Sequence, residues 1–182
     1  MRVGILALQG AYAAHEKHLR ALGHATTYVR EATDFDRIDG LVLPGGESSV
    51  HLALMDRFGL EQPILSLASQ RKPILATCAG IILIAREVRS PEQRSLGLLD
   101  IAVTRNAYGR QLESFEAEAD ETGVPLVFIR APRIIRHAAR VEVLATYRGE
   151  PVWVRQGHLM GAAFHPELTD DLRVHRAAFG IA

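Results

Sequence analysis

Short apolar runs alternate with longer amphipathic segments through the first half of the chain, and this alternation limits the possible folds most strongly. Runs of this kind are typical of strands that are buried on both faces of a parallel sheet. We expect strands at Val3–Leu8, Ala25–Val29, Gly40–Leu43 and Ile74–Thr77. We expect helices between them at Ala11–Leu22, Glu47–Phe58, Glu61–Gln70 and Ala79–Glu87. The pattern predicts an α/β fold with a doubly wound, mostly parallel sheet flanked by helices.

The second half of the chain changes character, because strand-like runs follow one another with short turns such as Arg148-Gly149-Glu150. These runs are Leu98–Thr104, Leu126–Ile129, Val141–Tyr147, Pro151–Arg155 and Leu159–Phe164. We therefore expect antiparallel pairs that extend the sheet, followed by a closing helix at Asp170–Phe179. The 182 residues contain no repeat or linker, so we expect a single domain over residues 1–182.

The charge balance argues against a nucleic-acid partner, and the short apolar runs argue against a membrane span or a signal peptide. Lys plus Arg and Asp plus Glu both number 21, whereas a nucleic-acid-binding protein usually has an excess of basic residues. The longest uncharged run, Pro73–Ala85, is shorter than the roughly 20 residues that span a bilayer. The apolar run Val3–Leu8 is also shorter than the ~7–15 residues of a signal-peptide core. We expect a soluble, cytoplasmic protein that binds neither nucleic acid nor membrane.

The only cysteine, Cys78, falls where the expected strand Ile74–Thr77 gives way to a helix. Open α/β sheets bind ligands at this end of their strands. Small neighbours, including Ala79 and Gly80, permit the tight turn that exposes a nucleophile. A helix N-terminus favours the reactive thiolate, and the Ala79 N–H could face a developing oxyanion. A small buried apolar residue is the competing interpretation of a lone cysteine.

A second motif, His165-Pro166-Glu167, follows the apolar run Leu159–Phe164. A thiol nucleophile needs a base, and the base needs a group that fixes its tautomer. If the chain is extended there, His165 and Glu167 face the same side. The alternative is an exposed histidine beside a glutamate that caps the last helix.

A third motif, Leu43-Pro44-Gly45-Gly46-Glu47-Ser48-Ser49, joins an expected strand to an expected helix. Two glycines let the backbone approach a ligand and direct its N–H groups toward it, so this loop could supply a second oxyanion donor. An ordinary turn with Ser48 or Ser49 as the helix cap is the alternative. The absence of the Gly-Lys-Ser/Thr ending argues against a phosphate-binding loop.

Along the chain the glycine motif comes first, then Thr77-Cys78-Ala79-Gly80, then His165-Pro166-Glu167. Motifs in this chain order resemble those of class I, triad-type glutamine amidotransferases, which have a flavodoxin-like fold. The chain resembles more closely the family of glutaminase subunits of pyridoxal 5′-phosphate synthase, and the similarity runs nearly from end to end. The residues that carry it are Leu8–Ala11, Leu43–Ser48, Thr77–Gly80, Arg105–Gln111, Ser114–Ala117, Phe128–Pro132 and His165–Thr169. The Arg105–Gln111 segment is the most specific part, because other amidotransferases share the triad but not this segment.

The resemblance implies a role for each matching residue. Cys78 would attack the glutamine amide and form a γ-glutamyl thioester, His165 would transfer protons, and Glu167 would orient His165. The residues implied to line the L-glutamine site are Gly46, Glu47, Ser48, Arg105, Ile129 and Arg130. Gln9 would lie near this site and the partner interface.

The resemblance also implies a partner, the synthase subunit that accepts the ammonia in a hetero-oligomeric complex. Members of this family are usually poor glutaminases until that partner binds. Neither a cofactor nor a metal ion is expected. Two alternatives are a glutaminase subunit for another pathway, such as histidine synthesis, and a non-catalytic binding protein on the same fold.

Overall fold

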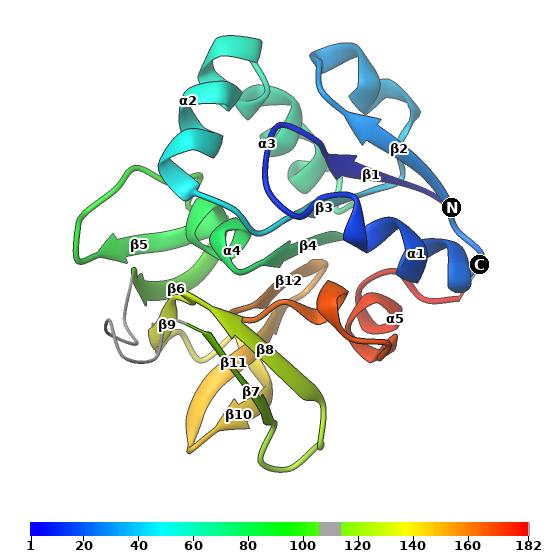
Figure 1. The fold of residues 1–182 in the computed structure, drawn as a ribbon. Coiled ribbons are helices and arrows are strands. Elements are labelled where there is room, and N and C mark those ends of the chain that lie inside the picture. Colours follow the sequence, from blue (N-terminus) through cyan, green and yellow to red (C-terminus); the bar gives the residue numbers. More distant parts are fainter. Residues whose placement is uncertain (106–113, 182) are drawn as a thin grey trace.

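The computed structural model describes residues 1–105 and 114–181, and its largest element is a seven-stranded sheet of order β10-β11-β12-β4-β3-β1-β2 (Figure 1). Neighbouring strands run parallel from β2 to β12, and β11 and β10 then continue the sheet antiparallel. The strands are β1 (Arg2–Leu6), β2 (Ala25–Val29), β3 (Gly40–Leu43), β4 (Ile74–Thr77), β10 (Glu142–Tyr147), β11 (Glu150–Gln156) and β12 (Leu159–Ala162). The predicted α/β class and the antiparallel extension are confirmed.

Helices cover both faces of this sheet (Figure 1). One face is covered by α1 (Ala14–Ala21) and α5 (Arg173–Phe179). The other face is covered by α2 (Ser48–Phe58), α3 (Glu61–Ser69), α4 (Ala79–Ile84) and the 3₁₀ helix η1 (Ala32–Arg37). None of the helices in the described part of the chain is long and apolar enough to cross a membrane.

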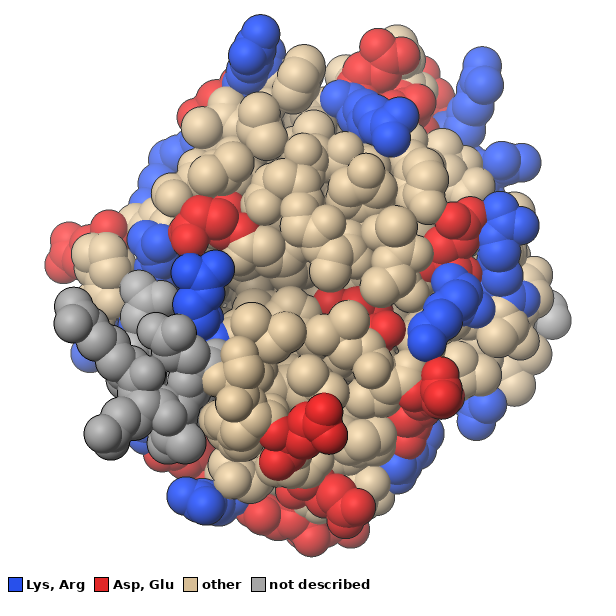
Figure 2. Space-filling model, in the orientation of Figure 1, with Lys and Arg blue, Asp and Glu red and all other residues tan. Residues whose placement is uncertain are grey.

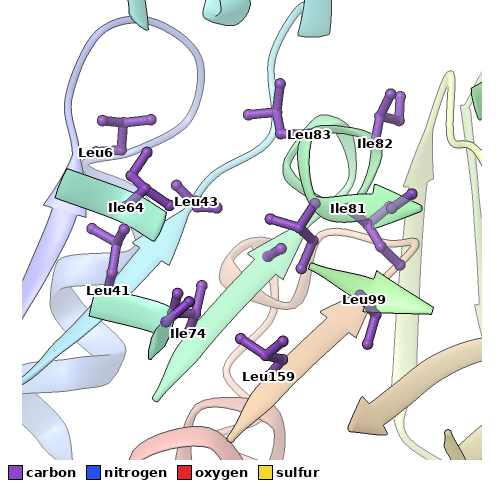
Figure 3. Packing of buried hydrophobic residues seen from close by; sticks show 14 of the residues in the cluster. Leu6, Leu41, Leu43, Ile64, Ile74, Ile81, Ile82, Leu83, Leu99 and Leu159 are labelled. Carbon is purple, nitrogen blue, oxygen red and sulfur yellow. The ribbon is translucent and has the colours of Figure 1, made fainter. Parts of the chain in front are cut away.

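Two apolar clusters, one on each face, hold the sheet between the helix layers. Successive strand residues contribute to opposite clusters, as the two-residue period of a strand requires. In β3, Leu41 and Leu43 pack with Ile64 of α3, whereas Val42 packs with Leu19 of α1. Figure 3 shows the cluster that contains Leu41, Leu43 and Ile64. Because the parallel strands are buried on both faces, they appear in the sequence as continuous apolar runs instead of alternating apolar and polar residues.

Two smaller sheets lie beside the central one (Figure 1). The first contains β5 (Ala85–Arg89), β6 (Leu99–Thr104) and β9 (Arg133–His137), and the second pairs β7 (Ser114–Glu118) with β8 (Pro125–Ile129). The predicted strands Leu98–Thr104 and Leu126–Ile129 therefore exist, but they belong to these smaller sheets.

Several predicted boundaries were wrong. The helix predicted at Ala79–Glu87 ends at Ile84, because the following residues pair with β6 as strand β5. The predicted helix at Asp170–Phe179 begins only at Arg173, after the short 3₁₀ helix η2 (Pro166–Leu168). The first predicted helix begins at Ala14 instead of Ala11, and the last predicted strand ends at Ala162. In each case a long-range pairing or a tight turn overrides the local apolar pattern.

Charged side chains of both signs are interspersed around the face shown in Figure 2, and uncharged residues fill most of its centre. This face therefore carries no broad field of one sign, in keeping with the zero formal net charge of the chain.

Candidate active site

The three motifs meet because they follow three neighbouring strands. The order β12-β4-β3 is parallel throughout, so the carboxyl ends of these strands lie at one edge of the sheet. Cys78 follows β4, the Gly45-Gly46 loop follows β3, and His165 lies three residues after the end of β12. The topology thus brings together side chains that are up to 120 residues apart in sequence.

Cys78 occupies a strained corner between β4 and α4. Its backbone has φ +46° and ψ −110°, a conformation that few residues other than glycine adopt. The Cys78 N–H donates a 2.9 Å hydrogen bond to the Ala162 carbonyl of β12, which fixes the corner to the neighbouring strand. Gly80 is required next to it, since a Cβ atom there would lie 2.1 Å from the Leu43 carbonyl oxygen. Strain held in this way is typical of a nucleophile at a strand-to-helix turn.

His165 and Glu167 form a buried pair. The imidazole Nδ1 lies 2.7 Å from Glu167 Oε1, and the Glu167 side chain is completely buried. The prediction of an extended backbone was wrong, because Glu167 lies in η2 and the turn brings the two side chains together. The His165 backbone N–H donates a 2.8 Å hydrogen bond to the Val127 carbonyl, so β8 holds the backbone of His165 in place.

The electrostatics of this pair favour an ionised state. Burial alone would lower the pKa of His165, but its interactions with Cys78 and Glu167 raise the pKa to about 10. Burial alone would raise the pKa of Glu167, but His15 and His165 lower it below its usual value. With Nδ1 directed at Glu167, Nε2 is the ring nitrogen left to exchange a proton with the thiol.

The glycine loop closes the site from the side of β3. A Cβ atom on Gly45 would lie 2.4 Å from His165 Cε1 and 3.2 Å from Cys78 Cβ, so only glycine fits without displacing the base. Gln9 holds the loop through the Glu47 backbone: Gln9 Nε2 donates to the Glu47 carbonyl at 3.0 Å. The Glu47 N–H donates to Gln9 Oε1 at 3.3 Å. Gln9 therefore lies beside the site, as the family resemblance implied.

A cavity of about 160 Å³ opens onto these groups. Its lining contains Ala11, Gly45, Gly46, Glu47, Ser48, Cys78, Ala79, Arg105, Ile129, Arg130 and His165. Every residue that we predicted for catalysis or glutamine binding lies in this lining except Glu167, which is buried behind His165. The remainder of the predicted Arg105–Gln111 segment, residues 106–111, lies outside the described residues.

Charged groups surround the cavity opening. Arg105 Nη2 donates to Glu47 Oε1 at 3.1 Å, so two of the predicted substrate-binding residues pair with each other. Arg130 follows β8 with φ +44°, a second strained backbone position in the cavity lining. The Cys78 thiol is directed toward the neighbouring Ile129 carbonyl at 3.7 Å.

Sequence reasoning missed two side chains that support the site. Gln93 accepts a 3.0 Å hydrogen bond from the Ser48 hydroxyl, and His15 lies behind Glu167 with 3.5 Å between His15 Nε2 and Glu167 Oε2. Neither had a distinctive local signal, since a histidine on an amphipathic helix is usually part of the core. Within residues 1–105 and 114–181, no group of three or more His, Cys, Asp or Glu side chains is arranged to hold a metal ion.

A cysteine at a strained corner, a buried His–Glu pair and a glycine loop at one sheet edge form the arrangement expected of a glutamine amidotransferase. The chain belongs to the SNO glutamine amidotransferase family, whose model matches residues 5–179. The family resemblance seen in the sequence is thereby confirmed.

Relatives of known name agree with this family. The protein named pyridoxal 5′-phosphate synthase subunit PdxT from Pelotomaculum thermopropionicum is 49% identical over 181 residues, covering 97% of this chain and 92% of that protein. The protein of the same name from Thermotoga maritima is 43% identical and covers 97% of this chain and 96% of that protein. A crystal structure described as a glutamine amidotransferase is 41% identical, with a TM-score of 0.91 over 98% of this chain and 97% of that one.

Proposed function

We propose that this chain is the glutaminase subunit of a pyridoxal 5′-phosphate synthase. It hydrolyses L-glutamine to L-glutamate and ammonia, and it supplies the ammonia to a synthase subunit in a hetero-oligomeric complex. The family and the names of the relatives at 43–49% identity support this assignment. The proposed active unit is a single domain formed by residues 1–182.

One observation carries the proposed chemistry: Cys78 and His165 line the same cavity, and Glu167 lies 2.7 Å from the far ring nitrogen of His165. In the proposed mechanism the Cys78 thiolate attacks the side-chain carbonyl carbon of glutamine. The developing oxyanion accepts hydrogen bonds from the backbone N–H groups of Gly46 and Ala79. His165 then donates its proton to the departing nitrogen, so ammonia leaves and a γ-glutamyl thioester remains.

The second half of the reaction uses the same groups in reverse roles. His165, now neutral, takes a proton from a water molecule that attacks the thioester carbonyl. The sulfur leaves as the Cys78 thiolate when the C–S bond breaks, and glutamate is released with the thiolate and the protonated His165 restored. Glu167 keeps the His165 tautomer fixed and stabilises the imidazolium in both halves.

The proposed glutamine site matches the charges of the free amino acid. The α-carboxylate pairs with the planar guanidinium groups of Arg105 and Arg130, which suit a carboxylate better than an ammonium group would. The α-ammonium pairs with the Glu47 carboxylate. Ser48 and Ile129 complete the wall of the cavity.

The test is a glutaminase assay on the wild-type chain and on Cys78→Ala, each with and without a pyridoxal 5′-phosphate synthase subunit. We expect the synthase subunit to raise ammonia release by the wild type, and Cys78→Ala to lower it by about 10³-fold or more. Ser69→Ala, on the exposed end of α3, is the matched control and should behave as wild type. Unchanged ammonia release by Cys78→Ala would overturn the assignment of the nucleophile.

The alternatives are tested separately. A glutamine-mimicking electrophile should modify Cys78, and an unmodified cysteine would favour a non-catalytic binding protein. Co-purification with the acceptor subunit of a different amidotransferase, instead of with the synthase subunit, would favour another pathway.

A further inference from the structure

The side of Glu167 that faces away from His165 is occupied by histidines. Glu167 Oε1 binds His165, whereas Oε2 has no hydrogen-bond partner within hydrogen-bonding distance. The nearest polar group is His15 Nε2 of α1, at 3.5 Å from Oε2. Both side chains are completely buried, so bulk solvent does not reach Oε2.

His15 is itself held from behind. Its Nδ1 lies 2.9 Å from His175 Nε2 of α5, and its Nε2 lies 3.4 Å from the Thr77 hydroxyl of β4. The His175 ring stacks on His18 with 4.5 Å between ring centroids, and His18 Nε2 lies 2.9 Å from the Thr169 carbonyl. His15, His18 and His175 are each at most 1% exposed. The arrangement leaves His15 little freedom to rotate.

The charge state of these rings follows from their burial. Burial lowers the pKa of His15 to about 4, despite the opposing effect of Glu167, and lowers the pKa of His175 well below its usual value. Both rings are therefore neutral near pH 7, where the positive charge beside Glu167 is that of His165. A neutral imidazole has a single N–H, and an ionised carboxylate can only accept. The carboxylate thus selects the His15 tautomer with its proton on Nε2, and His15 Nδ1 then accepts from His175 Nε2–H.

We propose that His15 is a positioning residue of the active site, whose Nε2–H holds the second oxygen of Glu167 while His175 fixes the tautomer of His15. This inference rests on the proposed function. The 3.5 Å separation is longer than a hydrogen bond, and contacts of this kind at active sites commonly tighten in the complex with substrate. Holding both carboxylate oxygens prevents Glu167 from rotating and keeps it ionised as His165 gains its proton.

The decisive variants are His15→Gln and His15→Asn, because they place an amide N–H at different points of the original ring. The Gln amide reaches the position of Nε2 and can still donate to Glu167, whereas the shorter Asn amide reaches only the position of Nδ1. We expect His15→Asn to lower kcat by about 10- to 100-fold and His15→Gln to retain most of it. His24→Gln is the control, since His24 is also buried but contacts the Gly180 carbonyl away from Glu167.

The pH profile of kcat/KM, measured in the complex with the synthase subunit, separates positioning from simple loss of packing. The titratable groups beside Glu167 are His15 and His165. Cys78 lies beside His165, and His18 and His175 lie beside His15. Losing the donor to Glu167 makes its carboxylate easier to protonate, so the acidic limb of His15→Asn should move to higher pH. The acidic limbs of His15→Gln and His24→Gln should lie at the same pH as that of the wild type.

Several outcomes overturn the inference. Equal kcat and equal acidic limbs for His15→Asn and wild type would exclude a positioning role, and so would equal losses in folded His15→Gln and His15→Asn. If His15→Asn does not fold, His175→Asn provides the second test, because loss of the tautomer-fixing contact should move the acidic limb in the same direction. A wild-type chain that releases no ammonia with the synthase subunit would instead overturn the proposed function.

Discussion

Arg105 Nη2 lies 3.1 Å from Glu47 Oε1 at the cavity opening, so a guanidinium and a carboxylate pair with each other where an amino-acid substrate would enter. Arg105 is the more enclosed partner, with its side chain 15% exposed against 45% for Glu47. A free amino acid carries one charge of each sign on its α-carbon. The carboxylate of the amino acid can therefore pair with Arg105 and its ammonium group with Glu47, so neither charge of the original ion pair is left unpaired.

Replacement of Arg105 by Lys should weaken glutamine binding more than it slows the reaction. A lysine keeps the positive charge but loses the planar fork that binds a carboxylate through two hydrogen bonds. We expect the KM for glutamine to rise about 10-fold while kcat changes less than about 3-fold, measured by steady-state ammonia release in the presence of the synthase subunit. Arg155→Lys is the control, since Arg155 pairs with Glu142 in the antiparallel extension. A fall in kcat with an unchanged KM would contradict a role in binding.

Gly45→Ala should impair catalysis because the added methyl group would lie 2.4 Å from His165 Cε1. The imidazole would have to move away from Cys78, and a displacement of about 1 Å can cost about 100-fold in rate. The control is Gly40→Ala at the opposite end of β3, where a Cβ would lie 3.0 Å from Pro73 and 3.1 Å from Phe179. It should lower thermal stability and leave kcat nearly unchanged. If both variants lose activity in proportion to stability, the effect at Gly45 is only structural.

The central sheet was predictable because its strands are apolar on both faces and alternate with helices over short stretches of chain. The two smaller sheets were not, since β7 and β9 lack a continuous apolar run and β5 follows directly on a helical pattern. The run Ile81–Val88 illustrates the difficulty: it continues from α4 into β5 with no glycine or proline to mark the change. Only the parallel pairing with β6 decides that Ala85–Arg89 is extended.

The site was predictable where a motif has a local mechanism, as in the strand–Cys–helix corner and the glycine loop. The supporting contacts had no such signal. His15 and Thr77 are 62 residues apart, and nothing in the sequence of α1 indicates that its buried histidine lies against a carboxylate from the opposite end of the chain. Contacts of this kind depend on how the helices are packed on the sheet, which the sequence pattern leaves open.

Gln9→Glu should slow catalysis by loosening the glycine loop. The Gln9 amide both donates to the Glu47 carbonyl and accepts from the Glu47 N–H. A carboxylate of the same shape can accept but not donate, so it would repel the carbonyl oxygen. We expect kcat to fall about 10-fold or more, because the loop carries a proposed oxyanion donor. Gln70→Glu, at the exposed residue that follows α3, is the matched control for the added charge, and equal kcat in both variants would argue against the loop's contribution.

His51→Leu should make the protein less sensitive to acid. His51 is fully buried in α2, and burial lowers its pKa from 6.5 to about 4 against the opposing effects of the Gly45 backbone and the Glu47 carboxylate. As the pH falls from about 6.5 toward 4, the unfolded chain binds a proton here that the folded chain does not, so the folded state loses stability. Between pH 7.5 and pH 5 this single group accounts for a loss of about 2 kcal/mol.

Urea unfolding at pH 7.5 and at pH 5 measures this loss directly. The difference in the free energy of unfolding between the two pH values should be about 2 kcal/mol smaller for His51→Leu than for the wild type. His137→Leu is the control, because His137 is exposed on β9 and its replacement should leave the difference unchanged. If His51→Leu loses as much stability as the wild type over this range, His51 takes up its proton in the folded state, and acid sensitivity must come from the buried rings of His15 and His175.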